Sequence, residues 1–288
     1  MKNTNLVVNW HITEKCNYHC KFCFAKWGKQ KETWDNFADA KAIIDNLYSE
    51  WKPNFRLNFV GGEPLLFKDK ILPVMEYAGS LGMDLSVQTN GTYLETLLPV
   101  IGYISQIGIS IDSWDAESNI EIGRCLGKKT LSLQELQSKI ELLRNAGGKF
   151  KLKINTVVSE WNWQDTVVPQ MKELTCDKIK ILRQMPFGTS KGISDFQFYS
   201  FINDNFDFSL PIYIEDNEIM TESYLMIAPN GRLFQNGTGS TYTYSDSLVT
   251  TPFAIARKQI NFNLYKFDER YKCDKTFEIV AKALQAVS

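Results

Sequence analysis

The sequence is poor in histidine, in long apolar runs and in net charge. Its 288 residues include only two histidines, so few imidazole ligands exist for a zinc site of the usual kind. No apolar stretch has the length of a membrane span, and the first five residues contain no signal-peptide core. A net charge of −1 provides no overall basic field for nucleic acid. These absences favour a cytoplasmic protein without membrane or nucleic-acid partners.

Three of the six cysteines lie within one run of eight residues, CNYHCKFC: Cys16, Cys20 and Cys23. Thiolates at this spacing can converge on one iron–sulfur cluster, and a four-iron cluster normally takes four of them. Three ligands in one loop therefore leave one iron open for another ligand. Two alternatives are a structural zinc site with His19 as its fourth ligand, and inert buried thiols.

The other three cysteines are isolated in the sequence: Cys125, Cys176 and Cys273. They are too dispersed to predict a second cluster, and they are typical of small buried hydrophobic residues. Three cysteines in one loop also fit a reducing compartment better than a disulfide framework.

Apolar strands that alternate with amphipathic helices predict parallel β/α units. Six strands are expected, at Leu6–Thr13, Arg56–Val60, Leu85–Thr89, Ile104–Ile111, Phe150–Val158 and Lys178–Gln184. A helix is expected over Ser132–Asn145, where apolar residues recur at helical spacing and two glycines follow. In β/α barrels the active site lies at the carboxyl ends of the strands, and the cysteine loop falls at such an end.

The pattern changes beyond residue 186, and no further β/α unit is expected there. We therefore predict a core, residues 1–186, and a smaller carboxyl-terminal α+β extension, residues 187–288, that closes the barrel mouth. Within the extension, Glu218–Leu225 is expected to be extended and Pro229-Asn230-Gly231 to form a hairpin turn. The end of the chain predicts one or two amphipathic helices.

Lysines alternate with apolar residues on the fifth and sixth expected strands. Period-two alternation places Lys151, Lys153 and Asn155 on one face, and Lys178 and Lys180 repeat the pattern on the next strand. The polar face of a barrel strand points inward, where a lysine is costly unless an anion meets it. The two strands thus predict a cationic chamber for a phosphorylated substrate. Alternatively, these lysines face solvent at a gap in the barrel.

A second motif, Gly61-Gly62-Glu63-Pro64, follows the second expected strand. Its glycines allow the backbone to approach a ligand, although alone it could be a simple strand-to-helix turn. Together with the pattern C-x3-C-x-aromatic-C, which includes Phe22, it resembles the motifs of the radical S-adenosylmethionine (SAM) superfamily. The resemblance implies an α/β fold with a partial (β/α)6 barrel and a [4Fe–4S] cluster on Cys16, Cys20 and Cys23. It also implies that SAM binds the open iron and is cleaved to a 5′-deoxyadenosyl radical.

Longer stretches resemble the viperin-like family of radical SAM enzymes. They are NWHITEKCNYHCKFCF from Asn9, SIDSWDAESNIEIGRCLGKK from Ser110, LKINTVV from Leu152, and ESY ending in Tyr224. The resemblance implies conversion of a ribonucleoside triphosphate (CTP, UTP or GTP) to its 3′-deoxy-3′,4′-didehydro analogue, a chain terminator used in antiviral defence. It also implies a reductant protein of the flavodoxin or ferredoxin type.

The same resemblance assigns roles to individual residues. For SAM it implies Phe22 beside the adenine, then Gly61, Gly62 and Glu63 at the amino group, and Asn90, Ser110 and Arg124 at the carboxylate and ribose. For the nucleotide it implies Asn9, Lys153, Asn155, Lys178 and Lys180. Tyr224 is the implied catalytic residue, as a late proton donor. Each has a structural alternative, such as a turn role for Asn90 or a surface ion pair for Arg124.

Two interpretations from other classes stay open. One is a radical SAM enzyme that modifies a peptide or another small phosphorylated substrate, although such enzymes often carry a second cysteine group that this chain lacks. The other is a non-enzymatic scaffold with a degenerate site. The stretch after Phe234 also lacks the basic cluster of animal viperins, and Val60 replaces a serine that is frequent before GGEP. The sequence therefore leaves the nucleotide base unassigned.

Overall fold

The structure is a computed structural model that describes residues 6–26, 28, 30–52, 54–186, 191–237, 242–270 and 273–286. The strands are β1 (Leu6–Thr13), β2 (Phe55–Gly61), β3 (Asp84–Thr89), β4 (Ile104–Ser110), β5 (Lys151–Val158), β6 (Lys178–Arg183), β7 (Ile212–Glu215), β8 (Leu225–Ile227), β9 (Arg232–Asn236) and β10 (Tyr242–Ser247). The α-helices are α1 (Phe37–Trp51), α2 (Lys68–Ser80), α3 (Ala116–Ile122), α4 (Leu133–Asn145), α5 (Asp195–Asn205), α6 (Asn217–Met220), α7 (Phe253–Ala256), α8 (Leu264–Glu269) and α9 (Cys273–Ala286). Short 3₁₀ segments are η1 (Thr33–Asp35), η2 (Pro64–Leu66), η3 (Leu94–Tyr103), η4 (Pro169–Leu174) and η5 (Arg257–Gln259).

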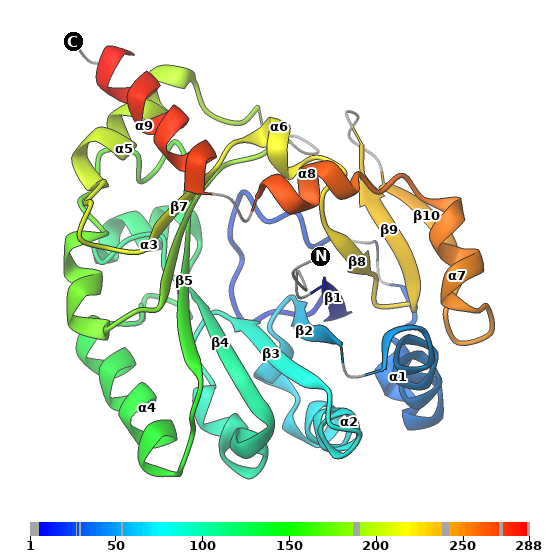
Figure 1. The fold of residues 1–288 in the computed structure, drawn as a ribbon. Coiled ribbons are helices and arrows are strands. Elements are labelled where there is room, and N and C mark those ends of the chain that lie inside the picture. Colours follow the sequence, from blue (N-terminus) through cyan, green and yellow to red (C-terminus); the bar gives the residue numbers. More distant parts are fainter. Residues whose placement is uncertain are drawn as a thin grey trace.

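The ten strands form one sheet in the order β10-β9-β8-β1-β2-β3-β4-β5-β6-β7. Neighbours from β8 through β1 to β7 run parallel, whereas β9 and β10 are added antiparallel. The parallel strands fan out as an open arc with α1, α2 and α4 on its outer side (Figure 1). The expected fold class, a partial β/α barrel with a smaller carboxyl-terminal α+β part, is confirmed.

The six expected strands are present, with small shifts at their ends, but the parallel part of the sheet contains two more strands, β7 and β8. β7 pairs with β6 in parallel after the helix α5, so the expectation of no β/α unit beyond residue 186 is wrong. The unit is hard to recognise because β7 has only four residues and α5 is rich in aromatic residues. The sheet continues across residue 186, and the proposed division there stays a prediction.

The carboxyl-terminal expectations are met in part. Asn217–Met220 is the helical turn α6, so the extended conformation expected from Glu218 is wrong at its start, and only Leu225 belongs to β8. The turn at Pro229-Asn230-Gly231 is confirmed, because it joins the antiparallel pair β8 and β9 and Gly231 has a φ of +76°. In Figure 1, α6 and α8 lie between the β7 side and the β9 side of the arc. Closure of the barrel mouth by this part of the chain stays a prediction.

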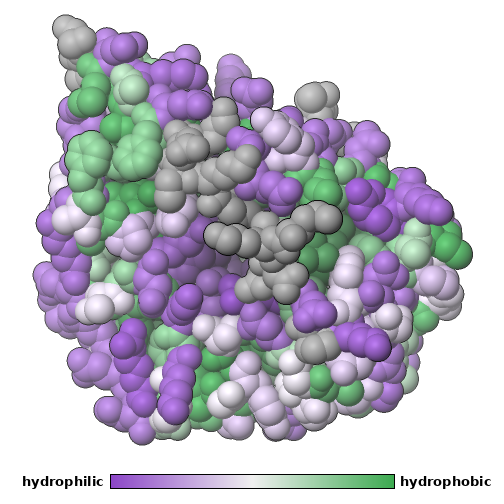
Figure 2. All heavy atoms as spheres, in the orientation of Figure 1, coloured by the Kyte–Doolittle hydropathy of each residue, from purple (hydrophilic) through white to green (hydrophobic). Residues whose placement is uncertain are grey.

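An apolar core fills the space between the sheet and the outer helices. Val8, Trp10 and Ile12 of β1 are fully buried in it together with Leu47 of α1. The intervening strand positions carry polar side chains toward the inside of the arc, as the period of two requires. Figure 2, in the orientation of Figure 1, shows a hollow near the middle of the molecule, with hydrophilic residues visible around it. No helix in the described ranges is both long and apolar enough to cross a lipid bilayer.

Candidate active site at the carboxyl ends of the strands

The cysteine loop follows β1 and is held from behind by the end of α3. His19 N–H donates to the carbonyl of Gly123 at 3.0 Å, and Lys21 N–H donates to the carbonyl of Ile122 at 2.8 Å. Gly123 has a φ of +86°, and a Cβ atom there would come within 2.4 Å of the His19 carbonyl oxygen. The loop can therefore take this position only because residue 123 is a glycine.

The GGEP turn holds the loop from its other end. Gly62 N–H donates to the carbonyl of Thr13 at 2.7 Å, and Glu63 N–H donates to that of Lys15 at 2.8 Å. A Cβ atom on Gly61 would lie 2.4 Å from the Thr13 oxygen, and one on Gly62 would lie 2.2 Å from the Lys15 oxygen. Both glycines thus have a structural task, the close approach of two backbones, in addition to the predicted contact with SAM.

Glu63 joins this turn to the end of β3. Its buried carboxylate accepts hydrogen bonds from the Thr89 hydroxyl at 2.7 Å, the Asn90 N–H at 2.8 Å and the Leu65 N–H at 3.0 Å. Burial raises the pKa of Glu63 to about 6 against these donors, since it disfavours the ionised form. Its predicted contact with the SAM amino group stays a prediction.

The donor set of the loop fits an iron–sulfur cluster. Cys16, Cys20 and Cys23 are half-buried free thiols, and the Cys16 sulfur accepts the N–H of Tyr18 at 3.4 Å. Burial, with smaller contributions from Glu63 and the other two sulfurs, raises the pKa of Cys16 to about 11. Thiolates placed together in this way need a positively charged group between them, which iron supplies. No three His, Cys, Asp or Glu side chains of the described residues are arranged to hold a single metal ion.

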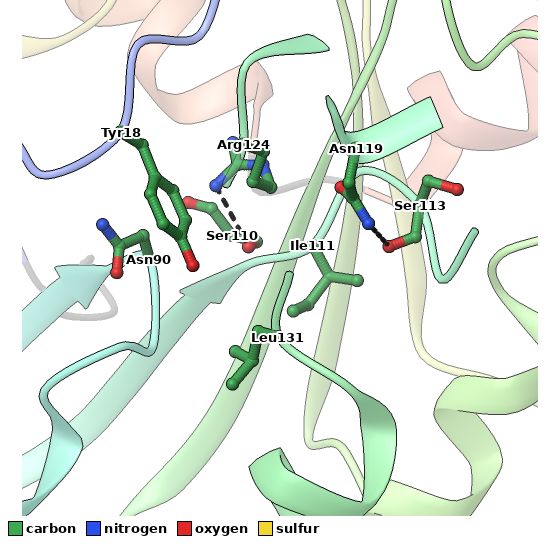
Figure 3. Close-up of a pocket in the computed structure, with 8 residues that line it drawn as sticks. All are labelled: Tyr18, Asn90, Ser110, Ile111, Ser113, Asn119, Arg124 and Leu131. Atoms are coloured by element: carbon green, nitrogen blue, oxygen red, sulfur yellow. Dashed lines mark hydrogen bonds between the residues drawn. The ribbon is translucent and has the colours of Figure 1, made fainter. Parts of the chain in front are cut away.

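A hollow lies beside the loop at the ends of β3 and β4. Its lining is Tyr18, Asn90, Ser110, Ile111, Ser113, Asn119, Arg124 and Leu131 (Figure 3). The structure therefore brings together the three residues predicted for the SAM carboxylate and ribose. Asn90 also donates to Asn17 Oδ1 of the cysteine loop at 2.8 Å, so the hollow and the cluster loop share one hydrogen-bond network. Phe22 lies in the loop and is half-buried, and its contact with adenine stays a prediction.

Arg124 has a partner that sequence reasoning missed. Its guanidinium bonds the fully buried Asp112 carboxylate at 2.5 Å and the carbonyl of Ser110 at 3.3 Å (Figure 3 marks the latter). Burial opposes the charge of Arg124, but Asp112 outweighs this effect and raises its pKa above the usual range. Asp112 also accepts the N–H of Val157 at 2.8 Å. Arg124 is therefore a fixed cation rather than a surface ion pair.

Gln88 on β3 connects the predicted SAM side with the predicted nucleotide side. Its amide donates to the Ser110 hydroxyl at 3.1 Å and accepts from the Asn155 amide, also at 3.1 Å. Asn155 Oδ1 is buried and has no hydrogen-bond partner in the described part of the chain, so a hydroxyl donor of a ligand would satisfy it. A Cβ atom on Gly108 would lie 2.1 Å from Gln88 Oε1, so glycine makes room for this link.

The lysines predicted to form a chamber have different surroundings in the structure, and the chamber itself stays a prediction. Lys151 lies exposed at the beginning of β5, so its expected place in the chamber is wrong. Lys153 stands opposite Lys178 in the sheet, and the Lys178 ammonium lies 3.8 Å from the centre of the Tyr213 ring. Burial, with a smaller contribution from the like charge of Lys180, lowers the pKa of Lys153 to about 7. Lys153 has no carboxylate partner among the described residues, and an anion would restore its charge.

Asn9 lies on β1, and Tyr224 lies next to the neighbouring strand β8. Asn9 Oδ1 accepts from Asn58 at 2.7 Å, and Asn58 in turn accepts from the Ser86 hydroxyl at 2.8 Å. This chain of polar side chains crosses the inner face of β1, β2 and β3, and only Asn9 was predicted. Tyr224 immediately precedes β8, and its hydroxyl donates to the buried Glu215 at 2.5 Å. Glu215 in turn bonds the Lys180 ammonium.

Known proteins share the sequence of this chain over most of its length. A protein from Fibrobacter sp. (strain UWH6) named S-adenosylmethionine-dependent nucleotide dehydratase is 44% identical, over 94% of this chain and 90% of its own. One of the same name from Psychrobacter lutiphocae is 36% identical, over 94% of this chain and 96% of its own. The profile of the Radical SAM superfamily matches residues 10–167.

Solved structures share the fold. Streptococcus suis SuiB bound to S-adenosylmethionine has a TM-score of 0.62 at 13% identity, over 93% of this chain and 68% of that chain. Native anSMEcpe with bound AdoMet has a TM-score of 0.60 at 13% identity, over 97% and 99%. The superfamily match implies a [4Fe–4S] cluster and SAM, in agreement with the three thiols and the hollow beside them. The chain belongs to the radical SAM superfamily and, within it, to the viperin-like family of S-adenosylmethionine-dependent nucleotide dehydratases.

Proposed function

We propose that this enzyme dehydrates a ribonucleoside triphosphate, CTP or else UTP or GTP, to its 3′-deoxy-3′,4′-didehydro analogue in antiviral defence. The observation that carries the proposal is Lys153, a largely buried lysine whose pKa is lowered to about 7 and which has no carboxylate partner in the described ranges. Such a group favours an anionic ligand because the anion restores its charge. The names of the relatives support a nucleotide as that ligand.

The reaction needs little chemistry from the side chains. When bound, the cluster and SAM supply the radical that removes the ribose 4′ hydrogen. Loss of the adjacent 3′ hydroxyl as water then gives the product once one electron and one proton have been supplied. We propose a flavodoxin or ferredoxin as the source of electrons. The protein's tasks are to hold the ribose beside the SAM hollow and to keep bulk water out.

Individual residues would divide these tasks. Lys153, with Lys178 beside it, would bind the phosphate groups, while Asn155 would accept a ribose hydroxyl through its unsatisfied Oδ1. Gln88 ties Asn155 to Ser110 and would fix the distance between ribose and SAM. Glycines at the loop contacts keep the cluster loop against the strand ends, so the reacting groups meet in one place.

The test compares the four common ribonucleoside triphosphates in anaerobic assays with SAM and dithionite. We expect one of them to stimulate 5′-deoxyadenosine formation strongly and to lose the mass of one water. Analysis of the product by mass spectrometry and NMR identifies the 3′,4′ double bond. No stimulation by any of the four would reject the proposal, and stimulation by a peptide substrate instead would favour the peptide-modifying alternative.

A further inference from the structure

A buried carboxylate, Glu215 at the end of β7, links the predicted substrate residues to the end of the chain. It is 1% exposed. One oxygen bonds the Lys180 ammonium, and the other accepts the Tyr224 hydroxyl at 2.5 Å. The Arg270 guanidinium lies 3.8 Å from that second oxygen. Lys180 and Tyr224 are expected at the site from the sequence, whereas Glu215 and Arg270 are not.

Arg270, in the segment between α8 and α9, is the fourth member of this cluster of Lys180, Glu215, Tyr224 and Arg270. Its guanidinium lies 3.6 Å from the centre of the Tyr224 ring, and it donates to the carbonyl of Ser223 at 2.8 Å. A planar cation against an aromatic face, with a backbone hydrogen bond beside it, fixes the ring in place. Since the superfamily match ends at residue 167, the whole arrangement lies in the part of the chain beyond it.

Two cations stabilise the charge of Glu215. Burial disfavours the ionised carboxylate, but Lys180 and Arg270 outweigh this effect and lower its pKa to about 2. One negative charge thus faces two positive charges, and Lys153 is close enough for Glu215 and Lys180 to act on its pKa. Glu215 thus keeps these cations from repelling one another before the substrate binds.

We propose that Glu215 is the positioning residue of the substrate end of the site, a role that rests on the proposed function. It holds the Lys180 ammonium and the Tyr224 hydroxyl at one fixed spacing, and Arg270 stabilises both Glu215 and the tyrosine ring. The Tyr224 hydroxyl directs its hydrogen to Glu215, so its oxygen is presented in one orientation. Lys153 then makes the main phosphate contact, and Tyr224 and Lys180 set the position of the ribose relative to SAM.

Glu215→Gln in the anaerobically reconstituted holoenzyme tests this role, because glutamine keeps the shape and removes the charge. We expect the ratio of 5′-deoxyadenosine to dehydrated nucleotide to rise about tenfold, since a misplaced substrate wastes the radical. Tyr224→Phe should raise the ratio similarly, and the double variant should not exceed the larger single effect. Glu218→Gln, an exposed carboxylate of the same segment, is the matched control and should leave the ratio unchanged.

A binding measurement without turnover separates positioning from mere stability. Calorimetry with inorganic tripolyphosphate should show that Glu215→Gln still binds the anion, because Lys153, the proposed main phosphate contact, forms no ion pair with Glu215 and stays in place. Arg270→Gln, which keeps the Glu215 contacts to Lys180 and Tyr224, should raise the ratio less than Glu215→Gln does. If Glu215→Gln does not fold, the positioning role is tested by the ratio of 5′-deoxyadenosine to dehydrated nucleotide in Tyr224→Phe and Arg270→Gln. An unchanged ratio in an active enzyme would overturn the positioning role, whereas an unaltered enzyme inert with every nucleotide would overturn the proposed function instead.

Discussion

Replacing Lys153 by methionine is expected to stabilise the ligand-free protein and to weaken substrate binding. Burial lowers the pKa of Lys153 from 10.5 to about 7, which means that the folded protein disfavours its charged form. A fall of this size corresponds to about 4–5 kcal/mol of unfolding free energy. Because the side chain keeps some contact with solvent, we expect a gain of about 2 kcal/mol for Lys153→Met.

The gain should depend on pH with a definite sign. Below pH 7 the lysine is charged in both folded and unfolded states, so its full cost is present and the methionine variant gains most. As pH rises from 7 towards 10.5 the folded protein already holds a neutral lysine, and the gain disappears. The charged groups that set this titration are Lys178, Lys180, Arg56 and Glu215, and all four remain in the variant.

Urea unfolding at pH 6.5 and at pH 9.5 measures the free energy of unfolding, and steady-state kinetics measure the KM for the nucleotide. Loss of one charge-assisted contact of about 1.5–3 kcal/mol should raise the nucleotide KM about ten- to hundredfold. SAM cleavage without nucleotide should change little. Lys151→Met, on the exposed beginning of the same strand, should alter neither quantity. A destabilised Lys153→Met protein, or equal losses in KM and in basal SAM cleavage, would refute this account of Lys153.

Two further predictions concern the glycine and glutamine contacts. Gly62→Ala should lower the iron content and the visible cluster absorbance of the reconstituted protein, because its Cβ would lie 2.2 Å from the Lys15 oxygen and would displace the cysteine loop; a normal cluster spectrum would contradict this. Gln88→Leu should leave the cluster spectrum intact but lower the yield of dehydrated nucleotide per 5′-deoxyadenosine, because it cuts the link from Ser110 to Asn155; unchanged coupling would show that the link is not needed.

Local patterns in the sequence predicted much of the fold. Strands β1 to β6 show period-two or continuous apolar patterns. The start of helix α4 is indicated by its N-cap residue Ser132, whose hydroxyl accepts the N–H of Glu135. The β8–β9 turn follows from its proline, asparagine and glycine. By contrast, β7 is too short for a pattern, and its place is fixed by pairing with β6 rather than by its own residues.

The site residues also divide into those with a local sequence pattern and those without one. The cysteines and GGEP stand in contiguous motifs, so sequence alone could identify them. Gln88, Glu215 and Arg270 act through partners distant in the chain, and the last two stand 55 positions apart. An isolated aspartate or glutamine has no local signature, and its importance follows only from what the fold places beside it.

The position of β8 beside β1 affects how the chain can fold during synthesis. β1 is made first, yet one of its edges pairs with Leu225–Ile227, which are made much later. Until then that edge, with Trp10 in the strand, lacks its permanent neighbour and is open to pairing with other nascent chains. Slow translation between β7 and β8 would lengthen this exposure, and chaperone demand during expression should rise with it.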